Sequence, residues 1–109
     1  MAYNLTVTNG GCQDAGVRPV SPVDFTATAD DFETITLEWD DNDADYDYGT
    51  IEYSLDEATW VDLIQFVPEL ETYEHVGLEA ETDYYYRLRT FKRTKWSAYS
   101  TADDTTPEE

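Results

Sequence analysis

The stretch Gly77-Leu78-Glu79-Ala80-Glu81-Thr82-Asp83-Tyr84-Tyr85-Tyr86-Arg87-Leu88 decides how this chain folds. Its second half places Tyr84, Tyr86 and Leu88 at every other position, which is the spacing of side chains that share one face of a β-strand. Its first half is rich in turn-forming and acidic residues, which are typical of the connection between two strands. The stretch therefore predicts a turn that leads into a strand with one buried face.

The same period of two recurs along the chain, in runs whose apolar members are Phe25, Ala27, Ala29; Ile35, Leu37, Trp39; and Ile51, Tyr53, Leu55. The residues between them are mostly Thr, Glu, Asp and Ser, so each strand should have one wet face. Turn-forming or acidic clusters separate the runs every 10–15 residues or so, and no window carries a sustained helical stripe. The pattern predicts an all-β, antiparallel sandwich.

These segments resemble, in order, those of a fibronectin type III module. The opening stretch is similar to the family's G-L-x-P-x-T-x-Y-x-Y-x-V segment, whose first Tyr forms a corner before strand F. Other matching segments are Ile35-Thr36-Leu37-Glu38-Trp39 in strand B, Ile51-Glu52-Tyr53-Ser54-Leu55-Asp56 with Trp60 in the next hairpin, Trp96-Ser97-Ala98-Tyr99-Ser100 in strand G, and the closing Thr105-Thr106-Pro107. The resemblance implies an immunoglobulin-like, seven-stranded antiparallel sandwich, with A, B and E facing C′, C, F and G. It makes five residues structural: Trp39, Tyr53, Leu78, Tyr84 and Tyr86.

The chain departs from the family pattern in three loops. Ala80-Glu81 stands where Pro-Gly is usual, and Lys95 replaces a frequent Gly before strand G. Gly49 precedes strand C where an aromatic residue is common, which suggests a bulge or a close backbone approach.

The domain organisation expected from this resemblance has three parts: an N-terminal extension over 1–20, the module over 21–107 and an acidic tail at 108–109. In the extension, Tyr3, Leu5 and Val7 alternate with polar residues as a short strand would. A lone strand buries too little to be stable, so this one should lie on the module or add to a sheet of another chain as an attachment element. A disordered leader is the alternative.

Charge is the second strong feature: 25 acidic against 6 basic residues give a net charge of −19. Such a charge argues against nucleic acid and anionic membranes as partners, and no segment is apolar enough to insert into a membrane. The basic residues, Arg18 excepted, gather at Arg87, Arg89, Lys92, Arg93 and Lys95. Since Arg87, Arg89 and Phe91 share the parity of Tyr85, they should project from the outer face of the sheet.

Two interpretations of this basic strip stay open. Its arginines can pair with neighbouring acids, because in the family that the chain resembles strand C lies beside strand F, which would bring Glu52 opposite Arg87 or Arg89. Alternatively, the strip is a docking patch for an acidic protein partner or a carboxylated host-surface glycan. The patch would comprise Tyr85, Arg87, Arg89, Phe91, Lys92, Arg93 and Lys95.

Metal and catalytic sites are not predicted. Asp41, Asp43, Asp45 and Glu52 reproduce the 1, 3, 5, 12 ligand spacing of a calcium loop, but Tyr46 occupies the position that requires Gly. The prediction is no metal and no cofactor, with a looser calcium site as the alternative. His75 is the only histidine and has no nucleophile or metal cluster beside it, so it should be a hydrogen-bonded structural residue and the protein should not be an enzyme.

The remaining aromatic residues, Trp60, Trp96 and Tyr99, could be partly exposed, either stacking on sugar or packing at a strand edge. A lone Cys12 allows no intrachain disulfide. A single acidic module that starts at Met1 without an export signal fits a phage virion protein: a capsid decoration, fibre or tail protein at the virion surface, bound to capsid or tail subunits. The alternatives are a carbohydrate-binding or spacer module of a secreted glycoside hydrolase, and a cell-surface adhesion module.

Overall fold

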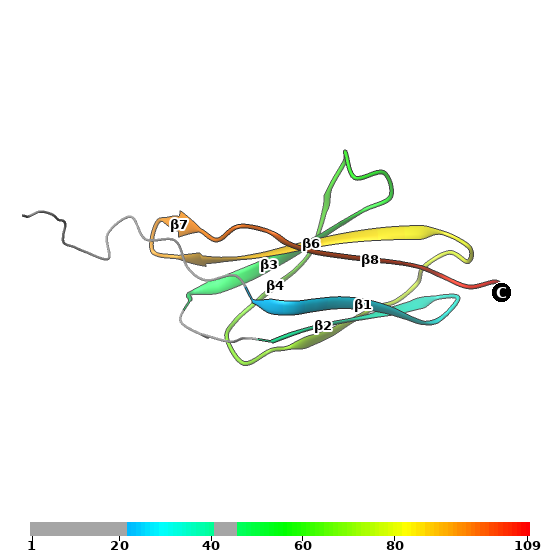
Figure 1. Cartoon of the computed structure of the whole chain (residues 1–109), viewed down its shortest axis with the longest axis horizontal. Coiled ribbons are helices and arrows are strands. Elements are labelled where there is room, and N and C mark those ends of the chain that lie inside the picture. The colour runs from blue at the N-terminus through cyan, green and yellow to red at the C-terminus, as the bar shows by residue number, and fades with distance from the viewer. Residues whose placement is uncertain (1–21, 41–45) are drawn as a thin grey trace, which may run out of the picture.

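Two antiparallel sheets packed face to face make up the computed structural model, which describes residues 22–40 and 46–109 (Figure 1). One sheet has the order β1-β2-β5, with bounds Val23–Asp31, Thr34–Asp40 and Thr72–His75. The other has the order β4-β3-β6, with bounds Val61–Phe66, Tyr48–Ser54 and Asp83–Lys92. Its last position is shared by β7 (Lys95–Trp96) and β8 (Ser100–Thr105), which both pair with β6. The predicted sandwich, with A, B and E facing C′, C, F and G, is confirmed.

Strand G differs from the simple expectation because it is split into β7 and β8. Ser97 lies between the two pieces, and its side chain replaces part of the backbone ladder. The Thr90 N–H donates to the Ser97 hydroxyl at 2.9 Å, while the Ser97 N–H donates to the Thr90 carbonyl at 2.8 Å. The chain therefore bulges at Ser97 while staying hydrogen-bonded to β6. Beyond the bulge, the Tyr99 ring lies beside Arg87 and Arg89 on the outer face of the sheet.

The core forms from the inward faces that the alternation predicted. Trp39, Leu78, Tyr84 and Tyr86 are buried, and Tyr53 packs against them while partly exposed. The rest of the core cluster comprises Ile35, Leu37, Tyr46, Ile51, Phe66 and Leu88.

Leu55 was expected to continue the buried run of Ile51 and Tyr53, and this prediction is wrong, because the Leu55 side chain is 58% exposed. Strand β3 ends at Ser54, where the chain turns. The Ser54 hydroxyl donates to the Asp56 carboxylate at 2.9 Å, and that carboxylate accepts the Thr59 N–H at 2.9 Å. A period-two pattern cannot detect where such a turn interrupts it.

Gly49 is needed because Phe66 lies directly against its backbone. A Cβ at this position would stand 2.3 Å from the Phe66 ring. That ring is buried, and its centroid lies 4.9 Å from that of the tilted Trp39 ring and 6.1 Å from that of Tyr46, which it meets edge to face. The expected close backbone approach is confirmed.

The corner before β6 forms as the resemblance implied. The Tyr84 hydroxyl accepts the Glu79 N–H at 3.0 Å. The Thr106 hydroxyl donates to the Glu79 carbonyl at 2.6 Å and so ties the end of the chain to the same corner. Glu81, standing where the family usually has Gly, adopts a left-handed φ of 55°. Any residue with a Cβ is strained in this conformation relative to Gly.

One pair of sheet edges is joined by side chains. The Ala29 N–H on β1 donates to the Asp104 carboxylate on β8 at 2.7 Å, and the Ser100 hydroxyl donates to the Pro22 carbonyl at 2.9 Å. These bonds connect the first and last strands of the module. In the described part of the chain, no helix is long and apolar enough to cross a membrane.

Candidate functional site

The outer face of the five-stranded sheet carries the most distinctive arrangement of side chains. Inward residues of β6 are buried, and the alternate residues point outward, as the sequence predicted. The register of β3 places Glu52 opposite Arg87 and Thr50 opposite Arg89. Residues directly opposite each other in an antiparallel pair share one face, so these side chains meet on the outer surface.

Arg87 is held by one carboxylate and two rings. Its Nε donates to Glu52 Oε1 at 2.7 Å, and its guanidinium carbon lies 4.3 Å from the ring centres of both Trp60 and Tyr99. The predicted pairing of Glu52 with a strip arginine is therefore confirmed for Arg87. The arginine and glutamate side chains are 26% and 19% exposed, so this pair is partly shielded from solvent.

Among the residues that the structure describes, Arg89 is held by aromatic rings and not by a carboxylate. Its guanidinium carbon lies 4.0 Å from the centre of the Trp96 ring and 4.7 Å from that of Tyr99. The Nε atom is buried and has no hydrogen-bond partner among the residues that the structure describes. Arg89 and Arg87 thus have the same chemistry and similar stacking, but within those residues only Arg87 has a carboxylate.

Together these groups form a continuous stacked row: Trp60, Arg87, Tyr99, Arg89 and Trp96. The Tyr99 ring is the shared member of the row, because its centre lies 4.3 Å from the Arg87 guanidinium carbon and 4.7 Å from that of Arg89. Each cation–π contact contributes about 0.5–1 kcal/mol at an exposed site, so the row rigidifies the face.

Sequence reasoning missed this row. It identified Trp60, Trp96 and Tyr99 only as partly exposed aromatics, and Tyr99 is indeed 37% exposed. Their stacking depends on the turn after β3 and on the bulge at Ser97, neither of which has a period-two signal. The spacing of Trp96 and Tyr99 beside two alternate arginines is the one available hint.

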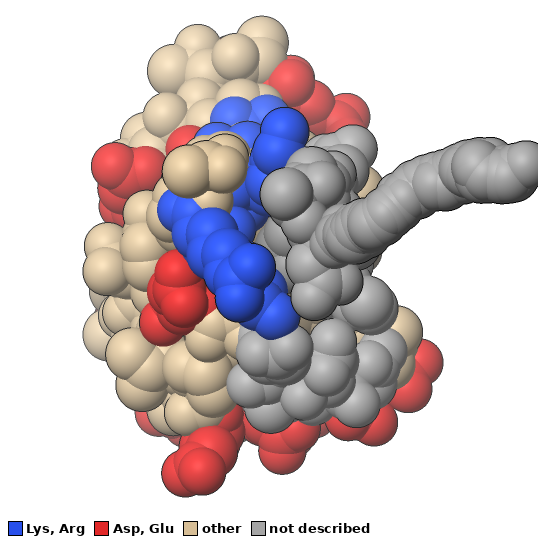
Figure 2. All heavy atoms as spheres, turned by 90° about the vertical axis from the view of Figure 1, so that its left-hand side faces the viewer, with Lys and Arg blue, Asp and Glu red and all other residues tan. Residues whose placement is uncertain are grey.

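The turn between β6 and β7 extends the positive charge. Phe91 stacks on Tyr48 at 5.2 Å and on Trp96 at 4.9 Å, which joins the turn to the stacked row. Arg93 adopts a left-handed φ of 59°, and its N–H donates to the Asp47 carboxylate at 2.9 Å. Figure 2 shows the Lys and Arg side chains as a band at this end of the molecule.

Tyr85 lies at the opposite, acidic end of the face. The charge of Asp83 is the main cause that raises the pKa of Tyr85, followed by burial and by the charges of Glu57 and Asp103. The register places Asp103 directly opposite Tyr85. The structure therefore divides the predicted patch into a basic part from Arg87 to Lys95 and an acidic surrounding at Tyr85.

His75 has the structural setting that the sequence predicted. It is buried, and its Nδ1 lies 3.0 Å from the Tyr86 hydroxyl. Burial lowers the pKa of His75 and raises the pKa of Tyr86, so the neutral forms of both are favoured in the folded state.

Several predicted site residues lie outside the described part of the chain. These are the attachment residues Tyr3, Leu5 and Val7, the lone Cys12, and the calcium candidates Asp41, Asp43 and Asp45. The fourth calcium candidate, Glu52, accepts the Arg87 hydrogen bond instead. Within residues 22–40 and 46–109, no three His, Cys, Asp or Glu side chains are grouped so that they could hold a metal ion.

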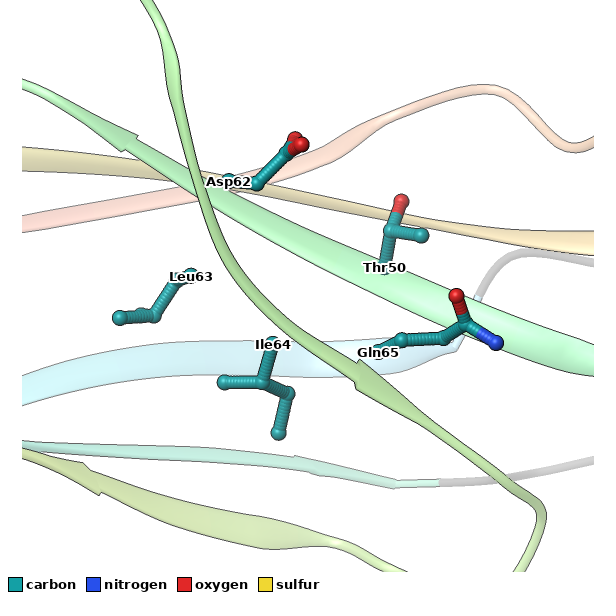
Figure 3. A pocket seen from close by; sticks show the side chains of 5 residues that line it. All are labelled: Thr50, Asp62, Leu63, Ile64 and Gln65. Carbon is teal, nitrogen blue, oxygen red and sulfur yellow. The ribbon is translucent and has the colours of Figure 1, made fainter.

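A shallow hollow of about 250 Å³ lies between β3 and β4. Thr50, Asp62, Leu63, Ile64 and Gln65 line it, and Asp62 and Thr50 point to the same side (Figure 3). Its one charged lining residue is an acid, Asp62. The hollow adjoins the stacked row through Thr50, which faces Arg89 across the strands.

Comparison with solved structures agrees with this architecture. A structure named FN3tt superposes with a TM-score of 0.71 at 24% identity, covering 84% of this chain and 97% of that one. A segment of two fibronectin type III domains from chicken tenascin gives 0.70 at 21% identity, covering 79% of this chain and 49% of that one. A β-1,2-glucanase from Parabacteroides distasonis gives 0.69 at 22% identity, covering 83% of this chain but 13% of the enzyme.

These likenesses define the fold: the described residues form a sandwich of the fibronectin type III type. No protein-family profile matches the sequence. No curated protein matches it either. The fold is compatible with a non-catalytic module or with a spacer inside a larger protein.

Proposed function

We propose that this chain is a non-catalytic binding module that holds a protein partner through the outer face of the five-stranded sheet. The observation that carries the proposal is the stacked row, continued by the cationic turn from Lys92 to Lys95, on a chain whose net charge is −19. A confined positive surface on an acidic molecule orients a partner and rejects contacts elsewhere. Aromatic and arginine side chains are also the residues that most often dominate binding energy.

The setting that we propose is a phage virion, with the module displayed as a capsid decoration, fibre or tail protein. Strong negative charge supports this setting, because it keeps densely displayed copies apart. The alternating residues Tyr3, Leu5 and Val7 support it too, since such a segment is suited to adding a strand to a capsid or tail subunit.

The attachment role is tested by deleting residues 2–18. The truncated protein should keep the melting curve of the module and should no longer be incorporated into particles. If the truncated chain is incorporated as well as the full chain, the attachment role is wrong. Capsid and tail genes beside the coding sequence would support the virion setting, and a hydrolase in the same reading frame would contradict it.

The second candidate is a module of a secreted glycoside hydrolase, which the likeness to part of a β-1,2-glucanase favours. Within this candidate, a spacer fits better than a carbohydrate binder. Sugar stacking needs an open ring face, whereas Trp60, Tyr99 and Trp96 each already contact a guanidinium group. A glycan array on which the isolated chain binds one glycan tightly and specifically would overturn the protein-partner proposal.

A further inference from the structure

We propose that Arg89 is the cation of this face that binds the partner, and that it takes a carboxylate from an acidic segment of a protein. This inference rests on the proposed function, because it names the chemistry of the same face. It starts from a difference between two neighbouring arginines. Arg87 already donates to Glu52, while Arg89 has only aromatic contacts in the described part of the chain.

Arg89 is positioned in advance for such a ligand. The rings of Trp96 and Tyr99 lie 4.0 and 4.7 Å from its guanidinium carbon, so its plane is restricted before any partner arrives. An ordered guanidinium loses less side-chain entropy on binding than a free one. Arg89 is only partly buried and its Nε is the donor enclosed by the protein, so a ligand would be met by the terminal Nη groups. Two parallel N–H donors match the two oxygens of a carboxylate.

The charges around Arg89 determine in which direction a bound acidic segment should run along this face. Arg93 and Lys95 are exposed beyond Arg89 and continue the positive surface. At the other end Asp83 and Asp103 surround Tyr85, and would repel further acids. An acidic segment should therefore run from Arg89 toward the β6–β7 turn, and not toward the corner before β6.

A protein fits this face better than a carboxylated glycan. Recognition of a sugar ring combines the charge with an aromatic platform, and each of the three rings of the row already contacts a guanidinium group. An extended acidic peptide needs no such platform, since it presents carboxylates on flexible side chains to the edges of the guanidinium groups.

The test is a titration of the ¹⁵N-labelled full chain at low salt, followed through the arginine side-chain N–H signals. The probes are an oligoglutamate peptide, a neutral oligoglutamine of equal length and an oligogalacturonate. The Arg89 signals should shift saturably with oligoglutamate, more than those of Arg87, and added salt should reverse the shift. Oligoglutamine should leave them unchanged.

Variants separate this role from general charge. Arg89→Lys keeps the charge but loses the planar fork, and should weaken oligoglutamate binding about tenfold. The matched control Arg87→Lys should change it less than about twofold, because Arg87 is already paired. Glu52→Gln should release Arg87 and strengthen binding. Thermal melts of each variant confirm that the fold is kept.

Three results would overturn the inference. They are Arg89 signals that do not shift with oligoglutamate, an equal loss of oligoglutamate affinity in Arg89→Lys and Arg87→Lys, and tighter binding of oligogalacturonate than of oligoglutamate. Loss of particle incorporation on deleting residues 2–18 does not depend on Arg89. The deletion can therefore disprove the attachment role of residues 2–18 while Arg89 still binds carboxylates. Equally, the titration can disprove the role of Arg89 while the attachment role stands.

Discussion

Replacing Gly49 with Ala should destabilise the module, and the structure gives the size of the effect. The new Cβ would stand 2.3 Å from the nearest atom of the Phe66 ring and 2.7 Å from two others. Carbon atoms pack at about 3.5–4.0 Å, so the ring would have to move by more than about 1 Å. It has no free space, since it is buried against Trp39 and Tyr46.

Two effects of this substitution oppose each other. Forced overpacking costs about 1–3 kcal/mol, and the crowded ring places this site at the upper end of that range. Ala in place of Gly returns about 0.5–1 kcal/mol, because the unfolded chain loses freedom. The overpacking term is larger, so the net destabilisation should be about 2 kcal/mol.

Urea unfolding followed by tryptophan fluorescence measures this change directly. With a slope of about 2 kcal/mol/M, the midpoint should fall by about 1 M. Phe66→Leu provides the control background, because the shorter side chain has no ring atoms against Gly49. There, the added Ala should cost less than about half as much, which a double-mutant cycle would report as coupling. An unchanged or higher midpoint for Gly49→Ala, or an equal cost in both backgrounds, would refute the reasoning.

Three further predictions concern the corner before β6 and the buried histidine. Tyr84→Phe removes the acceptor of the Glu79 N–H and should cost about 1–3 kcal/mol in urea unfolding; a loss below about 0.5 kcal/mol would mean that the corner bond is unimportant. Glu81→Gly relieves a φ of 55° and should raise the free energy of unfolding by about 0.5–1 kcal/mol, whereas Glu81→Ala should not. Burial lowers the pKa of His75 below its unfolded value of about 6.5, so the unfolded state binds the proton more readily. The His75 contribution should be complete above about pH 6.5 and decline as the pH falls from there through the folded-state pKa. Thermal melts of wild type and His75→Asn across that range measure the difference, and parallel pH profiles would contradict the assignment.

The sheets of this module could be predicted from local pattern, because burial of one face imposes a period of two on each strand. The inward residues of β6 follow from parity alone, whereas the corner at Tyr84 and the pairing of Glu52 followed from the resemblance to the fibronectin type III module. The prediction that Leu55 is buried was wrong, because a period-two pattern does not show the turn that begins at Ser54. The buried face of a strand can be predicted without knowing the geometry of the loops. The position of the turn at Ser54 cannot, because it is set by hydrogen bonds within the loop itself.

The stacked row could be predicted only in part. Parity indicated that Arg87 and Arg89 project outward, since both belong to a long regular strand. The three rings come from a turn and a bulged strand, so their positions depend on tertiary contacts with the arginines themselves. When side chains hold one another in place through tertiary contacts, their positions do not produce a periodic pattern in the sequence and cannot be predicted from one.

The most direct test of the binding role is site-specific photo-crosslinking in the cells that produce the protein. One variant carries p-benzoylphenylalanine at Thr101, which is exposed on the outer face opposite Arg87. The control carries it at Val76, which is 62% exposed just beyond the end of β5 in the other sheet. We predict one discrete protein adduct from position 101, carrying an acidic segment at the crosslinked peptide and lost with Arg89→Lys, and none from position 76. Adducts from position 76 alone, or an adduct from position 101 that Arg89→Lys leaves unchanged, would contradict the account.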